Sequence, residues 1–210
     1  TELIMGRALE SLDLHSWPLR HFGVKEAVLP FNMFPEVDPV LGPEMRSTGE
    51  VLGMADTFGS AFFKAEEASM PPLPLEGTVL ISLAVKSPKA LEVARAFTDL
   101  GFVIRATVGT HRFFHENNIP AEPILKIREG RPNIADAIMN REIHLIVNTP
   151  MDRLGQSDDA SIRQAAIRYR VPYITTLAAA LASAKGIEAC RKGRGGVRSL
   201  QSYHRELCQG

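Results

Sequence analysis

The sequence predicts an α/β protein with a doubly wound parallel sheet of five strands, and three observations indicate this class. Short apolar runs alternate with helical segments from about residue 76 to residue 190. Helix start and stop signals separate them, such as Ser87 and Pro88 before one helix and Gly101 after it. Hydrophobic residues make up 45% and charged residues 23% of the 210 residues, which excludes a collagen-like or wholly disordered chain.

The alternation predicts the position of each strand and helix. Residues 78–84 are apolar almost throughout, which is typical of a strand covered on both faces. The other expected strands are residues 102–106, 122–127, 144–148 and 173–175. The expected helices run from 88 to 101 and over 110–117, 132–140, 157–170 and 177–185. In the fourth of these, Asp158 and Asp159 stand in the first turn, where acidic side chains favour the helix dipole.

The first 75 residues predict only one strand and one helix, and two elements are too few to enclose a hydrophobic core. Residues 23–31 read as a short strand stopped by Pro30. Ser47 and Glu50 fit a capping box, and apolar residues at helical spacing predict one helix over 50–68. One strand and one helix cannot bury a core of their own, so this part is expected to be the end of a larger domain.

Two ends of the α/β segment are marked by composition. Residues 70–74 hold three prolines within four positions, which favours an extended linker. Residues 191–210 are Gly-rich and basic, and we expect a flexible tail rather than a nucleic-acid-binding arm.

Charge, hydropathy and cysteine content exclude several classes of partner. Lys and Arg together number 24, as do Asp and Glu, so no overall charge attracts nucleic acid or an anionic membrane. No stretch approaches the ~18 apolar residues that span a bilayer. The only cysteines are Cys190 and Cys208, which favours reduced thiols in the cytoplasm over a disulfide framework.

Candidate binding residues follow the carboxyl ends of the expected strands, where open α/β sheets bind ligands. Ammonium groups, hydroxyls and the free N–H groups of helix starts suit a phosphate or a carboxylate. Any one Thr or Asn is also explained as a helix cap, but together these residues predict an anion site. They are Lys86 and Lys89 after the first strand, Thr107 and Thr110 after the second, Lys126 after the third and Asn148 after the fourth.

Metal and nucleophile motifs are weak. His111 and His115 stand four apart on one helix, but no carboxylate of suitable spacing accompanies them, so a solvated helix face is favoured. There is no Ser-His-Asp order, CxxC, GxGxxG or Walker A pattern. We therefore expect no metal site and no catalytic residue.

Two groups of motifs resemble the large subunit of carbamoyl phosphate synthetase, over nearly the whole chain and in the family's order. Residues 23–31 and the stretch 34–51, with Leu41-Gly42-Pro43-Glu44-Met45-Arg46-Ser47-Thr48-Gly49-Glu50-Val51, resemble the end of its second ATP-grasp unit. Four further motifs resemble the methylglyoxal synthase-like C-terminal domain of the same subunit. They are 106–110 (Ala-Thr-Val-Gly-Thr), 126–132 (Lys-Ile-Arg-Glu-Gly-Arg-Pro), 147–150 (Val-Asn-Thr-Pro) and 171–176 (Val-Pro-Tyr-Ile-Thr-Thr).

The resemblance implies domains and two ligand sites. Residues 1–75 would be the ATP-grasp end and linker, 76–190 the allosteric domain and 191–210 the tail. A regulatory nucleotide monophosphate would bind at Thr107, Thr110, Lys126 and Asn148, and a second effector, ornithine in some members, at Glu26, Tyr173 and Thr175.

Two positions depart from the family pattern. The family commonly carries an Asp-Lys pair before the helix-opening Pro, whereas this chain reads Val85-Lys86-Ser87-Pro88, so Lys86 and Lys89 are alternatives for the phosphate. Pro150 supplies no hydroxyl.

The implied function is regulation of an ATP-dependent ligase that makes carbamoyl phosphate for arginine and pyrimidine biosynthesis. The parent enzyme would use ATP and Mg²⁺ or Mn²⁺, with the remainder of the large subunit and a glutamine amidotransferase small subunit as partners. This chain alone would hold no cofactor and catalyse nothing. One alternative is a free-standing methylglyoxal synthase-like lyase. Such an enzyme needs an aspartate as its base, and residues 128–133 contain no aspartate. The other is an effector-binding module without a partner.

Overall fold

The computed structural model describes residues 1–12, 19–33, 47–69, 71–149, 157–193 and 196–208. The chain divides into a larger unit, Phe22–Gly195, and a smaller one formed by Thr1–His21 with Gly196–Gly210. The smaller unit contains a 3₁₀ turn, Leu9–Ser11, and helix α7, Leu200–Cys208, where the Tyr203 and His21 ring centroids are 4.9 Å apart. The range predicted as a flexible tail therefore includes a helix.

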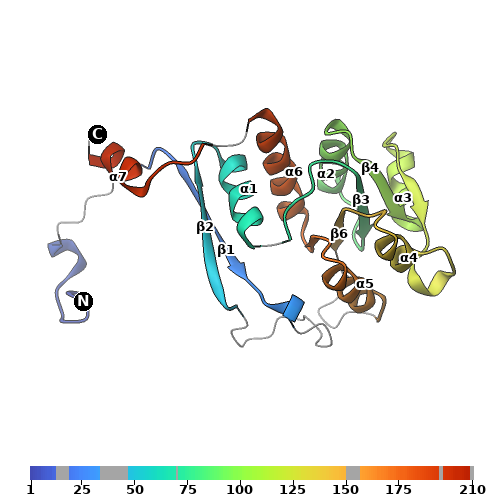
Figure 1. The fold of residues 1–210 in the computed structure, drawn as a ribbon, viewed down its shortest axis with the longest axis horizontal. Coiled ribbons are helices and arrows are strands. Elements are labelled where there is room, and N and C mark those ends of the chain that lie inside the picture. The colour runs from blue at the N-terminus through green and yellow to red at the C-terminus, as the bar shows by residue number, and fades with distance from the viewer. Residues whose placement is uncertain (13–18, 34–46, 70, 150–156, 194–195, 209–210) are drawn as a thin grey trace. The chain divides into compact units, whose positions relative to one another are not determined.

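A five-stranded parallel sheet forms the centre of the larger unit, and Figure 1 labels its strands β3, β4 and β6. The strand order is β5-β4-β3-β6-β7. Every neighbouring pair is parallel, so helical crossovers join successive strands. The predicted α/β class and five-stranded sheet are confirmed. The strands are β3 (Thr78–Leu83), β4 (Val103–Thr107), β5 (Glu122–Ile124), β6 (Leu145–Thr149) and β7 (Tyr173–Ile174).

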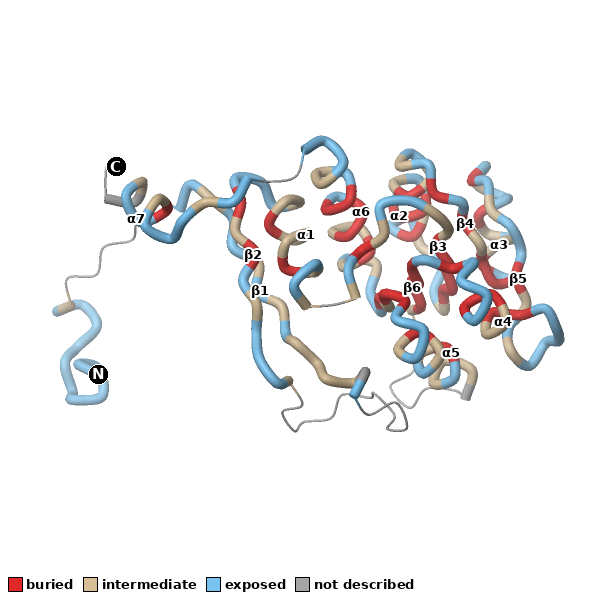
Figure 2. The backbone as a smooth tube through the Cα atoms, viewed as in Figure 1, coloured by how far each residue is buried: buried red, intermediate tan, exposed pale blue. Residues whose placement is uncertain are grey.

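Helices cover both faces of this sheet. On one face lie α2 (Pro88–Asp99), α3 (Val108–Glu116) and α6 (Leu177–Lys192), and on the other α4 (Ile134–Met139) and α5 (Ser157–Arg168). Along β3, Ile81 packs into the first core with Phe97, whereas Leu80 packs into the second with Ile138. Burial on both faces explains the uninterrupted apolar run (Figure 2).

Several of these elements differ in length from the prediction, and β5 and α6 are two examples. Strand β5 ends at Ile124 rather than at residue 127, because the chain then turns into a 3₁₀ helix, Ile127–Glu129. The backbone N–H of Lys126 donates to the Glu129 carboxylate at 2.8 Å and holds this turn. Helix α6 continues seven residues beyond the expected end at Lys185, to Lys192.

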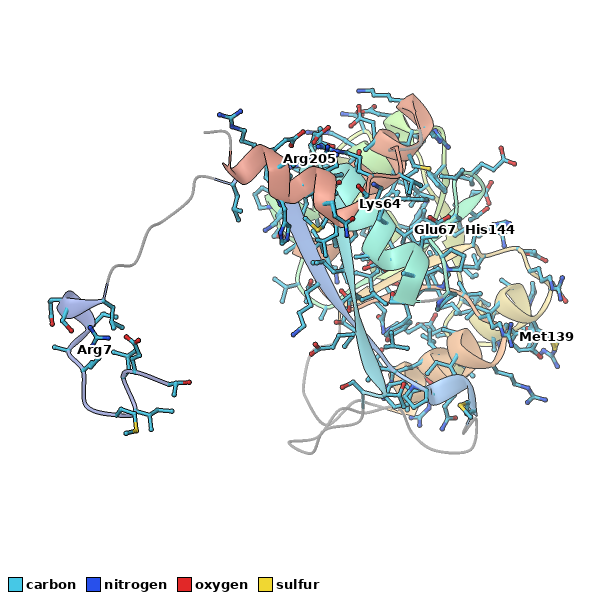
Figure 3. All side chains as sticks on the ribbon, turned by 60° about the vertical axis from the view of Figure 1, so that its left-hand side comes forward. Arg7, Lys64, Glu67, Met139, His144 and Arg205 are labelled. Atoms are coloured by element: carbon cyan, nitrogen blue, oxygen red, sulfur yellow. The ribbon has the colours of Figure 1, made fainter. Side chains whose placement is uncertain are left out.

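A second, smaller layer consists of an antiparallel strand pair and one helix. Strands β1 (Phe22–Val28) and β2 (Gly49–Ala55) pair with each other, and α1 (Phe58–Ser69) packs against both strands and against α6. Lys64, labelled on α1 in Figure 3, donates to the Met54 carbonyl at 3.0 Å.

The predicted helix over residues 50–68 is wrong in its first third. Residues 49–55 form a strand because they pair with β1 along its whole length, from Gly49 opposite Val28 to Ala55 opposite Phe22. The helix begins after Thr57, whose carbonyl and hydroxyl oxygens accept the N–H groups of Ala61 and Ser60. Ser47 therefore does not cap it.

Glycines let α1 approach its neighbours closely. A Cβ at Gly53 of β2 would lie 2.1 Å from the Ala61 carbonyl oxygen, and one at Gly59 would lie 2.7 Å from the Lys185 carbonyl oxygen. Gly186 of α6 faces Phe62 and Gly59 at the same crossing. Larger residues at these positions would push backbone apart.

Some predictions lie outside the described residues, namely the motif stretch 34–46, Met70 in the linker, and Pro150. The domain boundaries at 75 and 190 stay predictions. No helix among the described residues is long and apolar enough to cross a membrane.

Candidate functional site

Two buried threonines join the end of β3 to the start of α3. Strand β4 ends at Thr107, and α3 begins at the next residue. The Thr110 hydroxyl oxygen accepts the backbone N–H of Leu83 at 3.1 Å and a hydrogen bond from the Thr107 hydroxyl at 3.2 Å. Thr110 is completely buried and Thr107 almost so, and the two hydroxyls hold the start of α3 against the end of β3.

The start of α3 combines unpaired N–H groups with a lysine ammonium. The first N–H groups of any helix lack intrahelical partners and carry the positive end of its dipole. Lys86 Nζ donates to the Leu83 carbonyl at 3.0 Å and lies 3.9 Å from where a Cβ of Gly109 would stand. A full and a partial positive charge thus meet at one helix start, which suits a multiply charged anion.

All three predicted lysines are exposed, and Lys126 and Lys89 differ from Lys86 in having no hydrogen bond from their ammonium groups to a described residue. Lys126 follows β5, in which Ile124 pairs with Thr107, so the lysine lies beside the start of α3 in the sheet order. Its ammonium forms no hydrogen bond or ion pair with any described residue. Lys89 is exposed in the first turn of α2, and no bond connects it to the other predicted site residues in the described chain.

Asn148 is almost completely buried at the end of β6, with 2% of its surface exposed. Its Nδ2 donates to Asp159 Oδ1 at 2.9 Å and to the Tyr173 hydroxyl oxygen at 2.8 Å. Burial raises the pKa of Tyr173, while the hydrogen bond from Asn148 and the nearby Arg163 oppose that rise. Sequence reasoning missed Asp159 and Arg163, because the only signal at Asp159 was an acidic first turn, which the helix dipole already explains.

The three residues of the second predicted site are not joined by contacts. Tyr173 contacts Asn148, a residue of the first predicted site. Among the described residues, no hydrogen bond or ion pair links Glu26 to Tyr173 or to the exposed Thr175. Glu26 acts instead on Glu66 of α1, whose pKa rises to about 7 through burial first and the charge of Glu26 second.

A shallow pocket of about 580 Å³ lies between α4, α5 and the turn after β5. Arg128, Arg131 and Asp136 line it, with exposed Met139 (Figure 3), but none of the nine predicted site residues does. Arg131 pairs with Asp136 and holds the pKa of that carboxyl below its ordinary value. Arg128 pairs with Asp158 at 3.3 Å, so both arginine charges are already opposed within the chain.

In the part of the chain that the structure describes, neither the pair His111 and His115 nor any cluster of acidic residues forms a metal centre. The rings of His111 and His115 lie 6.3 Å apart by centroid, and His115 is exposed. No group of three or more His, Cys, Asp or Glu side chains could hold a metal ion among these residues.

Comparison with known proteins gives a family match and close relatives. The family described as "MGS-like domain" matches residues 89–175. The chain is 50% identical over 208 residues to the carbamoyl phosphate synthase large chain of Archaeoglobus fulgidus, covering 98% of this chain and 19% of that protein. The corresponding protein of Gemmatimonas aurantiaca is 51% identical, covering 89% of this chain and 17% of its own length.

A third relative is named as a section of the large chain. The "Carbamoyl phosphate synthase large chain, C-terminal section" of Aquifex aeolicus is 47% identical over 189 residues, covering 87% of this chain and 35% of that protein. The chain spans about a fifth of the full-length relatives. It therefore carries an MGS-like domain and belongs with the C-terminal part of the carbamoyl phosphate synthase large chains.

Proposed function

We propose that this chain is the regulatory part of a carbamoyl phosphate synthase large chain and binds a nucleoside monophosphate effector. The phosphate would lie at the start of α3, on Lys86, Thr107, Thr110 and Lys126, with Asn148 beside it. The observation that carries the proposal is that the Lys86 ammonium lies close to Gly109, at the positive end of the α3 dipole. The buried hydroxyls of Thr107 and Thr110 belong to the same helix start.

The activity of the parent enzyme belongs to the same proposal. The relatives' name supports an ATP-dependent ligase, which would use ATP with Mg²⁺ or Mn²⁺, act with a glutamine amidotransferase small subunit in the cytoplasm, and supply arginine and pyrimidine biosynthesis. Phosphoryl transfer needs metal ions and a cationic cradle for the triphosphate. We therefore expect no ATP-dependent carbamoyl phosphate formation by this chain alone.

A second effector with an ammonium group is proposed near Glu26, Tyr173 and Thr175. The proposal rests on the resemblance of these three positions to the family's pattern, since no hydrogen bond or ion pair joins Glu26 to the other two among the described residues.

The alternative lyase function is less well supported. It needs a carboxylate base free to remove a proton in the loop after β5. In that loop, Glu129 carries the only carboxylate between residues 125 and 133, and it accepts the N–H of Lys126 at 2.8 Å. Its structural role in the turn favours effector binding over catalysis.

Calorimetric titration with uridine and inosine monophosphates tests the proposal. A charge-assisted hydrogen bond contributes about 1.5–3 kcal/mol, so Lys126→Ala should weaken binding about ten- to a hundredfold. His111→Ala, on the helix α3 at whose start the phosphate would lie, is the control and should leave the affinity nearly unchanged. If Lys126→Ala binds either nucleotide as tightly as the wild type, the site assignment is wrong.

A further inference from the structure

The side-chain amide of Asn148 has a defined orientation. Its Nδ2 lies 2.9 Å from Asp159 Oδ1 and 2.8 Å from the Tyr173 hydroxyl oxygen. A carboxylate oxygen only accepts hydrogen bonds, so the nitrogen of the amide, and not its oxygen, must face Asp159. Both hydrogens of that nitrogen are then used.

The oxygen of the amide has no hydrogen-bond partner among the described residues. No described residue donates a hydrogen bond to Asn148 Oδ1, although only 2% of the residue is exposed. This oxygen is not among the fully buried, unsatisfied side-chain atoms of the described residues, so it reaches the surface, where a donor group of a ligand can approach it. Asn148 can therefore serve a ligand only as an acceptor.

A phosphate cannot satisfy this acceptor. The oxygens of an ionised phosphate themselves accept hydrogen bonds and would repel Asn148 Oδ1 and the neighbouring carboxylate of Asp159. Hydroxyl and N–H groups, in contrast, donate. The strand ends thus differ chemically, with cations and donors at β3–β5 and a neutral acceptor next to a carboxylate at β6.

The two kinds of strand end are adjacent. Asn148 pairs with Ser82 in the sheet register, and the next residue of β3, Leu83, donates its N–H to Thr110. The start of α3 follows β4, so a phosphate there lies two strand spacings, about 10 Å, from Asn148 on β6. The sugar or the base of a nucleotide would span that distance.

We propose that Asp159 is a positioning residue that, with Tyr173, turns the carbonyl of Asn148 toward a hydrogen-bond donor of the effector, a ribose hydroxyl or a base N–H group. This inference rests on the proposed nucleotide site and assigns which end of the site receives the phosphate and which receives the sugar or base. Asn148 then selects the sugar or base of the effector and takes no part in holding its phosphate.

The test compares Asp159→Asn with Asp158→Asn in calorimetric titrations. Both changes remove one negative charge from the first turn of α5, but Asp158 pairs with Arg128 and does not contact Asn148. The probes are inorganic phosphate, ribose 5-phosphate and uridine monophosphate. Tyr173→Phe is a second variant, which removes the other acceptor of Asn148 Nδ2.

With asparagine at position 159 the amide of Asn148 can turn over. We expect about three- to tenfold weaker binding of uridine monophosphate, the loss of one neutral hydrogen bond, with phosphate binding unchanged. Tyr173→Phe should act in the same direction, and Asp158→Asn should change nothing. Weaker ribose 5-phosphate binding as well assigns the donor to the sugar, and an effect on the nucleotide alone assigns it to the base.

Two results would overturn the inference while leaving the nucleotide site in place. One is equal weakening of phosphate and nucleotide by Asp159→Asn, and the other is no weakening of either. A wild-type chain that binds none of the three probes overturns the proposed function itself. A change in ligand preference, rather than in stability, separates the positioning role from a structural one.

Discussion

The five-stranded region and the β1–β2–α1 region contact each other through α6, yet they are stabilised in different ways. In the first, large side chains such as Phe97, Leu80 and Ile146 are completely buried. In the second, the buried apolar side chains among the described residues are alanines at 55, 61 and 65, while Phe22 and Leu52 are 50% and 63% exposed. Figure 2 shows the same contrast along the chain.

This difference teaches how each region depends on its surroundings. The five-stranded region buries enough apolar surface on both faces of its sheet to stabilise itself. The β1–β2–α1 region relies on close backbone approach at Gly53, Gly59 and Gly186. We therefore expect it to open first in hydrogen exchange, before the strands of the larger sheet.

The largest expected effect comes from Phe97→Ala. Phe97 is fully buried, and its ring meets Phe102 edge-on at 5.7 Å between centroids. Removing it should lower the free energy of unfolding by about 3–5 kcal/mol, measured by denaturant unfolding. Phe58→Ala in α1 is the comparison, and at 40% exposure it should cost only about 1 kcal/mol. Equal losses would erase the contrast between the regions.

A smaller but localised effect is expected from Gly53→Ala. The new Cβ would lie 2.1 Å from the Ala61 carbonyl oxygen, so α1 must move, at a cost of about 1–3 kcal/mol. Hydrogen exchange should accelerate over residues 22–69 and stay unchanged in β3 and β4. Gly23→Ala is the matched control on β1, since its Cβ would meet only Leu52 Cδ1, at 3.6 Å. Uniform acceleration across both regions would show that they unfold together.

The smallest effect is a pH dependence confined to α1. In the folded chain the pKa of Glu66 is about 7, against an ordinary value of 4.5. Between pH 4.5 and pH 7 the folded state therefore keeps a proton on Glu66 that the unfolded state has already lost. The stability that this proton provides is present at low pH and is lost as the pH rises through about 7. Because the side chain is partly exposed, we expect a loss of only about 1–2 kcal/mol.

The measurement is the free energy of opening of α1 by hydrogen exchange at pH 5 and pH 8. Glu66→Gln should remove the difference between the two values, and Glu26→Gln should reduce it, because the charge of Glu26 is the second cause of the shift. Glu67→Gln, at the exposed neighbour labelled in Figure 3, should leave it unchanged. A wild-type chain that is more stable at pH 8 would contradict the assignment.

Much of the larger sheet could be predicted because its signals are local. The apolar run 78–84 and the caps at Ser87 and Gly101 depend only on neighbours in the chain, and strand β3 and helix α2 lie where these signals indicate. Strand β2 could not be predicted, since Val51, Ala55 and Phe58 also match a helical period. Pairing with β1, more than twenty residues away, decided its conformation.

For the candidate site, the sequence by itself determined which residues end each strand, and so which side chains gather at one edge of a parallel sheet. Only the tertiary structure decided that Asp159 meets Asn148 and that Lys86 lies over Gly109. Hydrophobic periodicity indicates which side of each segment is buried, because apolar side chains recur with the period of the helix or strand that they belong to. It carries no information on which strand neighbours which, and a contact between two side chains depends on that order.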